Sequence, residues 1–270
     1  KVTTPVAEAP AVYPKEKSGD DSFYNVTTYE LEGKKVKKVL KEYYSNGQKD
    51  ESNTTTTLVT YTNKKYPTLV VETRPGAVRK IEYTYNDQDK VTSMKYTNNG
   101  NTEVKQLEYD EKGRVTKITV TNISQIPKTY TYTYPDDKTI VKKETLSYGG
   151  LNIITYTIEG GNLVKEVLEL KNEGGRLERT IVKTYEYDLS IKNPNLSIET
   201  RLVKPYFYGN KTYSPETVSK NVLTKKVTTS PVREENRSST FTYQKNAQGY
   251  PTEVDERTSG NTRSRITYEY

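Results

Sequence analysis

One short unit recurs along almost the whole chain, and it constrains the fold more than any other feature. Each copy has two aromatic residues separated by one residue, then a polar turn that often holds Gly, then a Val/Ile-rich segment. The tyrosines that anchor three successive copies, Tyr85, Tyr109 and Tyr134, are 24 and 25 residues apart. A fixed period of this length indicates tandem repetition of one supersecondary unit.

The pattern inside a copy predicts a β-hairpin. Around Tyr83 the neighbours are Glu82 and Thr84, so an extended strand has one aromatic and one polar face. In the clearest copy, 107–120, Asp110 opens the turn and Gly113 stands where a short loop needs a left-handed residue. Asn246 and Gly249 occupy the same two positions in a later copy.

Successive hairpins with short turns predict an all-β, antiparallel up-and-down meander of roughly 18 strands. The sequence leaves open whether the sheet forms an open barrel, a closed barrel or two packed layers. Residues 1–22 hold three Pro and no apolar period, so we expect a flexible tether followed by one repetitive domain, 23–270. If the first or last strand has a free edge, it could pair with another copy, and the oligomeric state stays open.

Residue types that are absent exclude several chemistries. The 270 residues contain no Cys and no His, which removes disulfides, Ser-His triads and nearly all zinc and iron sites. We therefore predict no cofactor, no metal and no catalytic residue. No apolar run approaches the length of a membrane helix. Lys95, Lys105 and Lys142 interrupt the strands and Trp is absent, which argues against an outer-membrane channel.

Two sets of residues resemble known families. The pattern Tyr109-Asp110-x-x-Gly113-Arg114-x-x-x-Ile118 resembles the YD repeat of Rhs-type bacterial surface proteins. Residues 249–254, together with the terminal 266–270, resemble a family of secreted Bacteroidetes lipoproteins, a domain of unknown function with a porin-like fold. This second resemblance implies export to the cell surface or periplasm of a Gram-negative bacterium, and it implies no enzyme activity. The resemblance also implies that the protein attaches to the membrane only through a lipid anchor, which is removed here together with the leader.

Charged clusters are the first candidates for chemistry. Acidic neighbours on one strand point to opposite faces, so they cannot flank one bond as glycosidase carboxylates do. Lysines among apolar residues favour solvated strands over nucleic-acid binding, because Lys also prevents pairing at strand edges. The acidic pairs are Asp136-Asp137, Glu234-Glu235 and Asp255-Glu256, and the basic clusters are Lys34, Lys35, Lys37 and Lys38, then Lys225 and Lys226.

Tyrosine supplies the candidate ligand-binding residues. Most tyrosines alternate with polar residues at strand period, which favours a role in the core. Tyr206, Phe207, Tyr208 and Tyr213 differ, since they lie between Pro205 and Pro215 in a segment that we expect to be a loop. This segment either plugs the open end of the sheet or forms a binding surface.

The leading functional hypothesis is a non-catalytic, exported binding or structural lipoprotein whose partner is a glycan or an envelope protein. A glycan-capture protein that uses the loop from Tyr206 to Tyr213 is one alternative. A carboxylate-based hydrolase is another, and it requires two inward carboxylates in one cleft. A carrier of apolar ligands is the last, and it requires a continuous apolar cavity, which the low aliphatic content disfavours.

Overall fold

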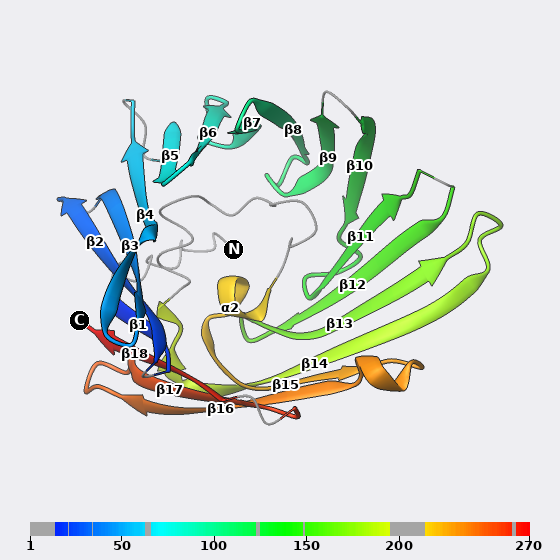
Figure 1. The fold of residues 1–270 in the computed structure, drawn as a ribbon. Coiled ribbons are helices and arrows are strands. Elements are labelled where there is room, and N and C mark those ends of the chain that lie inside the picture. The colour runs from blue at the N-terminus through cyan, green and yellow to red at the C-terminus, as the bar shows by residue number, and fades with distance from the viewer. Residues whose placement is uncertain are drawn as a thin grey trace, which may run out of the picture.

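The computed structural model shows a single closed β-barrel (Figure 1). It describes residues 14–20, 22–33, 35–62, 66–122, 125–147, 149–194, 214–260 and 263–270. These residues form eighteen antiparallel strands, the short helix α2 (Pro215–Val218) and the 3-10 turn η1 (Arg233–Glu235).

The strands follow one another around the barrel in chain order. The first nine are β1 (Lys15–Gly19), β2 (Phe23–Glu32), β3 (Lys35–Ser45), β4 (Gln48–Thr60), β5 (Leu69–Arg74), β6 (Ala77–Tyr85), β7 (Val91–Asn98), β8 (Asn101–Tyr109) and β9 (Val115–Asn122). The second nine are β10 (Gln125–Thr133), β11 (Thr139–Thr145), β12 (Leu151–Glu159), β13 (Asn162–Lys171), β14 (Leu177–Lys192), β15 (Asn221–Thr229), β16 (Arg237–Lys245), β17 (Pro251–Thr258) and β18 (Arg263–Glu269).

Closure depends on the first strand, which pairs with the last. Strand β1 forms antiparallel ladders with β18 on one side and with β2 on the other. The predicted up-and-down meander is therefore confirmed, and of the three forms that the sequence left open the chain adopts the closed barrel. Every described strand has two strand neighbours, so the edge on which a second copy could add a strand is absent from the described residues.

The start of the barrel differs from the expected domain boundary. We expected a tether over residues 1–22, but residues 15–19 of that segment are strand β1. The sequence Lys-Glu-Lys-Ser-Gly holds no apolar residue, so no periodicity marks it as a strand. Backbone pairing to both neighbours stabilises β1 instead. Residues 1–13 lie outside the described part of the chain.

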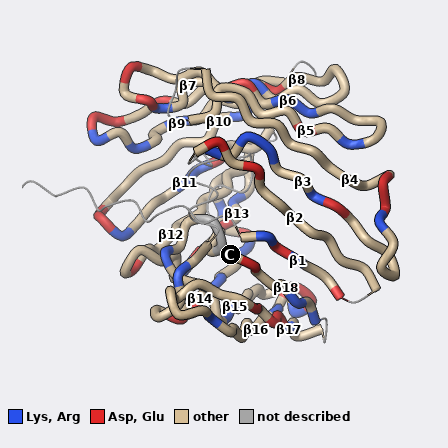
Figure 2. The backbone as a smooth tube through the Cα atoms, turned by 90° about the vertical axis from the view of Figure 1, so that its left-hand side faces the viewer, with Lys and Arg blue, Asp and Glu red and all other residues tan. Residues whose placement is uncertain are grey.

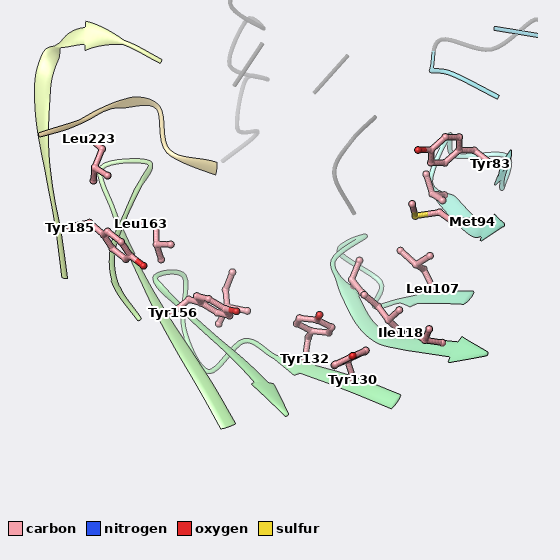
Figure 3. Close-up of a cluster of buried hydrophobic side chains, with 14 residues drawn as sticks. Tyr83, Met94, Leu107, Ile118, Tyr130, Tyr132, Tyr156, Leu163, Tyr185 and Leu223 are labelled. Atoms are coloured by element: carbon pink, nitrogen blue, oxygen red, sulfur yellow. The ribbon is translucent and has the colours of Figure 1, made fainter. Parts of the chain in front are cut away.

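The aromatic face of the repeat points into the barrel. Figure 3 shows the buried core residues on the concave side of the wall, from Tyr83 on β6 to Leu223 on β15. They are paired across neighbouring strands, as Tyr83 is with Met94 and Ile118 with Tyr130. Residues that alternate with them, such as Glu82 beside Tyr83 and Thr131 beside Tyr132, are exposed on the outer face. The prediction that repeat tyrosines belong to the core is confirmed for Tyr83, Tyr130, Tyr132, Tyr156 and Tyr185, all of which are buried.

The turns inside the repeat have the predicted chemistry. Asp110 Oδ1 accepts a hydrogen bond from the Arg114 backbone N–H at 2.8 Å, and Gly113 adopts a φ of 73°. Asn246 and Gly249 reproduce this geometry in the later copy. In the copy that lacks Gly, Asp89 takes the left-handed position with a φ of 57°. One polar side chain and one left-handed residue thus define the turn.

The second tyrosine of each repeat has a different role from the first. Its hydroxyl donates a hydrogen bond to a backbone carbonyl near the start of the preceding strand. These two strands form a hairpin, and the bond joins them at the end opposite the turn between them. The donor and acceptor pairs are Tyr85–Pro67, Tyr109–Val91, Tyr134–Val115, Tyr187–Leu163, Tyr243–Leu223 and Tyr270–Pro251, with O···O distances of 2.5–2.8 Å. We call this end of the barrel, which also carries the turns at 110–114 and 246–250, the tyrosine rim.

We expect Tyr109→Phe to lower the free energy of unfolding by about 1 kcal/mol, the typical net value of one hydrogen bond. The ring stays in place, and the 2.6 Å bond to the Val91 carbonyl is lost. Urea denaturation measures the change. Tyr96→Phe is the matched control, because the structure shows no hydroxyl bond from Tyr96 to any described residue. An equal loss in both variants would contradict the role of the tyrosine rim.

Candidate functional site

The segment predicted as a ligand-binding loop lies mostly outside the described residues. Tyr206, Phe207, Tyr208 and Tyr213 all fall within 195–213, so their assignment stays a prediction. The structure does describe the chain on both sides of this segment, where Pro194 and α2 lie at the tyrosine rim. Figure 1 shows α2 inside the ring of strands, and Val218 of this helix packs against the buried core.

A buried polar network fixes the chain on both sides of the segment. Asn221 donates its side-chain amide to the carbonyls of Leu189 and Ile191, at 3.0 and 3.1 Å. It also exchanges hydrogen bonds with the side chain of Asn162, through its backbone N–H at 2.9 Å and its side-chain oxygen at 3.1 Å. Asn193 donates to the Ser219 carbonyl at 2.8 Å. We call these four residues, Asn162, Asn193, Ser219 and Asn221, the asparagine cluster.

Ser219 joins the asparagine cluster to the tyrosine rim. The Leu163 backbone N–H donates to Ser219 Oγ at 3.0 Å, Ser219 Oγ donates to the Tyr187 hydroxyl, and that hydroxyl donates to the Leu163 carbonyl. Ser219 and Leu163 are fully buried. Buried polar groups that are satisfied in this way specify one arrangement of the backbone. Both anchors of the 195–213 segment are therefore rigidly held.

The inner wall also carries charges beside its aromatic residues. Lys183 Nζ lies 2.6 Å from Glu166 Oε1, and the Tyr185 hydroxyl donates to the other oxygen of Glu166 at 3.3 Å. Lys105 pairs with Glu103 at 3.2 Å. These pairs face the barrel interior from neighbouring strands, so the inner surface is amphipathic and not continuously apolar.

Lys142 is the most buried charge, with 2% of its surface exposed. Its ammonium lies 4.4 Å from the centre of the Tyr130 ring, and burial lowers its pKa, while Glu144 and Glu166 oppose that shift. Burial also raises the pKa of Tyr130 to about 12, with Glu144 adding to the effect. Lys105 and Lys142, which in the sequence argue against a lipid-facing band, both point inward. Each lysine stands opposite a buried core residue on the neighbouring strand, so its charge is surrounded by protein side chains and not by solvent.

The outer wall is crossed by ion pairs between neighbouring strands. Lys95 stands opposite Glu82 across the β6–β7 ladder, with 3.5 Å between Lys95 Nζ and Glu82 Oε2. The neighbouring pair, Tyr83 and Met94, is buried on the inner face. Figure 2 shows both signs of charge spread over the wall, not only at the turns. Other outward pairs are Glu30–Lys38, Glu108–Lys117, Glu186–Lys225, Asp255–Arg263 and Glu253–Arg265. Each Lys or Arg at the middle of a lipid-facing wall costs about 2–4 kcal/mol, so this surface is suited to water.

The acidic neighbours singled out in the sequence have structural partners. Asp255 faces outward and accepts hydrogen bonds from Arg263, which hold the pKa of the Asp255 carboxyl below its usual range. Glu256 faces inward and accepts a hydrogen bond from the Ser264 hydroxyl at 3.3 Å. Their opposite directions follow the strand alternation that the sequence predicted. Asp136 lies between strands β10 and β11, where it accepts a hydrogen bond from the Lys138 backbone N–H at 2.7 Å. Glu235 pairs with Arg179.

The residues of the basic clusters do not form one surface, because some are in ion pairs and they lie on both faces of the wall. Lys37 lies 2.8 Å from Glu32, and Lys225 lies 3.0 Å from Glu186. Lys226 stands opposite Tyr185 across the β14–β15 ladder and therefore faces inward. Lys34 is outside the described residues.

Glu16 is a carboxylate that the sequence argument did not single out. It lies on the inner face of β1, between Thr27 on β2 and Tyr268 on β18. Burial raises its pKa, and the nearby Lys41 only partly offsets the effect. The charged form of Glu16 is therefore disfavoured at the position where the barrel closes.

We expect Glu16→Gln to stabilise the barrel at pH 7. Because the pKa is higher in the folded state than in the unfolded chain, wild-type stability falls as pH rises from the ordinary Glu pKa through the folded-state value. The glutamine variant does not titrate, so its advantage at pH 7 should disappear below about pH 4. Urea denaturation at both pH values measures this difference. Glu269→Gln, an exposed neighbour, is the control, and a variant less stable than wild type at pH 7 would contradict the expectation.

Metal and membrane-helix signals are not found in the described part of the chain. No group of acidic side chains there is arranged to hold a metal ion. Among the same residues, no helix is long and apolar enough to cross a membrane.

A cleft of about 510 Å³ lies over strands β18, β1, β2 and β3. Its lining includes Lys17 on β1, Tyr24 and Val26 on β2, and Glu42 and Tyr44 on β3. The sequence argument missed this site. One signal was present, because Tyr43 and Tyr44 are adjacent on one strand and must point to opposite faces. One of the two rings therefore has to lie on the outer wall.

These features define an eighteen-stranded up-and-down barrel with an aromatic inner wall and a charged outer wall. Its fold is similar to that of a porin-like protein from Bacteroides uniformis, with a TM-score of 0.51, 15% sequence identity, and coverage of 96% of this chain and 97% of that chain. A porin-like protein from Bacteroides vulgatus matches with a TM-score of 0.44 and 14% identity, over 77% of this chain and 99% of that chain. At 15% identity the first likeness shows the fold alone. No protein-family model matches the sequence, and no curated protein matches it.

Proposed function

We propose that this chain is a non-catalytic binding or structural module of the bacterial envelope, and that its porin-like barrel is surrounded by water. One observation carries the proposal: the two faces of the wall are inverted relative to a lipid-spanning barrel. A membrane barrel places its apolar band outside and its polar residues inside. Here the buried tyrosine and aliphatic residues of the core face inward, and ion pairs such as Glu82–Lys95 face outward.

Export and lipid anchoring belong to the same proposal and rest on the resemblance of residues 249–254 and 266–270 to secreted lipoproteins. Under this proposal a lipid chain, and not the barrel wall, attaches the protein to the membrane. Cell fractionation with metabolic palmitate labelling of the full-length protein tests this point. A labelled, membrane-associated protein that becomes soluble when its anchor is removed would support it. Unlabelled protein that is recovered from the cytoplasm would contradict it.

Two alternative functions fit the inner wall less well. A carrier of apolar ligands needs a continuous apolar cavity, but charged residues such as Lys142 and Glu166 interrupt the inner wall. The acidic pairs considered for a hydrolase are engaged in turns, in ion pairs or on opposite faces, as Asp255 and Glu256 are. These placements support a non-catalytic role.

Incubation of the purified protein with glycans, cell-wall fragments and mucin tests the proposed function. Saturable retention of one component, recovered chemically unchanged, is the expected result. Mass spectrometry of the recovered material detects turnover, and release of smaller products would contradict the non-catalytic role. If retention depends on the 205–215 segment, Tyr206→Ala weakens it, whereas unchanged retention removes that segment from the binding site.

A further inference from the structure

The outer cleft is positioned by the strand that closes the barrel. Lys17 on β1 lies between Thr267 on β18 and Val26 on β2, on the side of the sheet opposite to inward-facing Glu16. We call this cross-strand row, which continues to Glu42 on β3, the floor of the cleft, and Tyr24 and Tyr44 also line the cleft. Figure 2 faces this part of the wall, where β18, β1, β2 and β3 lie side by side. The volume of about 510 Å³ falls within the range of small-molecule sites.

Tyr24 offers the cleft an aromatic face that, among the described residues, a flexible side chain covers. One face of its ring stacks on Tyr44, with the centroids 4.9 Å apart and the planes 9° from parallel. Over the other face lies the Lys17 ammonium, 4.0 Å from the ring centre. The cross-strand neighbour on that side is Gly19, which has no side chain. Because an exposed cation–π contact contributes only about 0.5–1 kcal/mol, a ligand can displace the lysine.

Some of the charged residues around the cleft form ion pairs and others do not. Lys15 pairs with Glu269 at 3.3 Å, and Glu42 pairs with Lys49 at 3.0 Å. Lys17 forms no ion pair with any described residue, so its ammonium lacks an anionic partner within that part of the chain. The Glu42 carboxylate, at the other end of the floor, can accept further hydrogen bonds from hydroxyl groups.

We propose that this cleft binds a saccharide that carries a carboxylate, such as a uronic acid unit. Such a pyranose ring has an apolar C–H face that packs on the face of Tyr24 from which Lys17 is displaced. Its hydroxyl groups donate to Glu42, and its carboxylate pairs with the displaced Lys17. A purely apolar ligand would desolvate the Lys17 ammonium without supplying an anionic partner, which is unfavourable. The proposal rests on the proposed binding function, and it assigns that function a location and a ligand class.

Isothermal titration calorimetry with a galacturonic acid trimer, and with its methyl ester, tests the proposal. The ester keeps the sugar rings and removes the charge. We expect saturable binding of the acid by the wild-type protein, and binding of the ester that is about tenfold weaker, the value of one charge-assisted hydrogen bond. Lys17→Gln should weaken acid binding by about tenfold and abolish the preference for the acid. Tyr24→Leu should weaken both ligands.

Lys95→Gln is the matched control, because Lys95 lies on the outer wall far along the barrel from the cleft and should not alter binding. If Tyr24→Leu fails to fold, Lys17→Gln still tests the proposal, because Lys17 forms no ion pair with a described residue that its replacement would remove from the fold. Equal affinities for acid and ester, wild-type binding by Lys17→Gln, or no saturable binding would each overturn the proposal. Cleavage of the trimer would instead contradict the non-catalytic function, so the two failures are distinguishable.

Discussion

Asn221→Ala is expected to lower the free energy of unfolding by about 3 kcal/mol. The substitution removes the acceptor of the Asn162 side chain and the donor to the Leu189 and Ile191 carbonyls. Each buried polar group left without its partner costs about 1–3 kcal/mol, so three such losses place the variant among strongly destabilised ones. The asparagine cluster joins strands β13 and β15 to the end of β14, so the loss also affects the anchors of residues 195–213.

Urea denaturation followed by far-ultraviolet circular dichroism measures this effect. Asn53→Ala serves as the control, because the exposed Asn53 side chain donates to Asp50 on a single strand. Surface substitutions of this kind change stability by about 0.5 kcal/mol or less. A loss below about 1 kcal/mol for Asn221→Ala would show that the asparagine cluster does not hold the rim.

Tyr132→Ala is expected to cost about 3–5 kcal/mol, as for other large aromatic residues removed from a core. Tyr132 is 3% exposed on the inner wall, where it stands opposite Lys142. Its removal leaves a cavity beside the most buried charge of the barrel. Thr131→Ala is the matched control, since Thr131 is the adjacent residue on the same strand and is exposed on the outer wall.

The comparison of these two neighbours tests the direction of the faces. We expect Thr131→Ala to change stability by less than about 1 kcal/mol, the range of strand propensity. Chemical denaturation of both variants gives the two values. A larger loss at Thr131 than at Tyr132 would mean that the inner and outer faces have been assigned the wrong way round.

Local rules were sufficient to predict the strands and turns of the repeated hairpins. The alternation around Tyr83 predicts which face is aromatic, and the structure confirms that this face is the core. Asp110 with Gly113, and Asn246 with Gly249, predict turns whose hydrogen bonds the structure reproduces. These features depend on residues within one hairpin, so short sequence windows contain the information.

Features that join distant segments could not be predicted in this way. The bond between Asn162 and Asn221 spans 59 residues, and no local period marks either residue. Closure of the barrel depends on backbone pairing of β1, whose side chains show no strand pattern. The inward direction of Lys105 and Lys142 also escaped the sequence argument, because it follows from the register of each hairpin and not from residue type.

The outer cleft was missed for a related reason. Tyr24 and Tyr44 are far apart in the sequence and meet only because β2 pairs with β3 in one register. Lys17 reaches them from a strand that was expected to be part of a tether. The aromatic segment that the sequence did favour, with Tyr206 and Tyr208, lies outside the described residues.

Spin labelling of the outer wall tests the central claim most directly. The chain has no Cys, so Thr131→Cys introduces a single attachment point for a nitroxide on the outer face. Electron paramagnetic resonance of the protein bound to envelope membranes then compares collisions of the label with water-soluble nickel complexes and with oxygen dissolved in lipid. If the wall is surrounded by water, the label is accessible to nickel. A label reached by oxygen and shielded from nickel would place the wall in lipid and contradict the proposal.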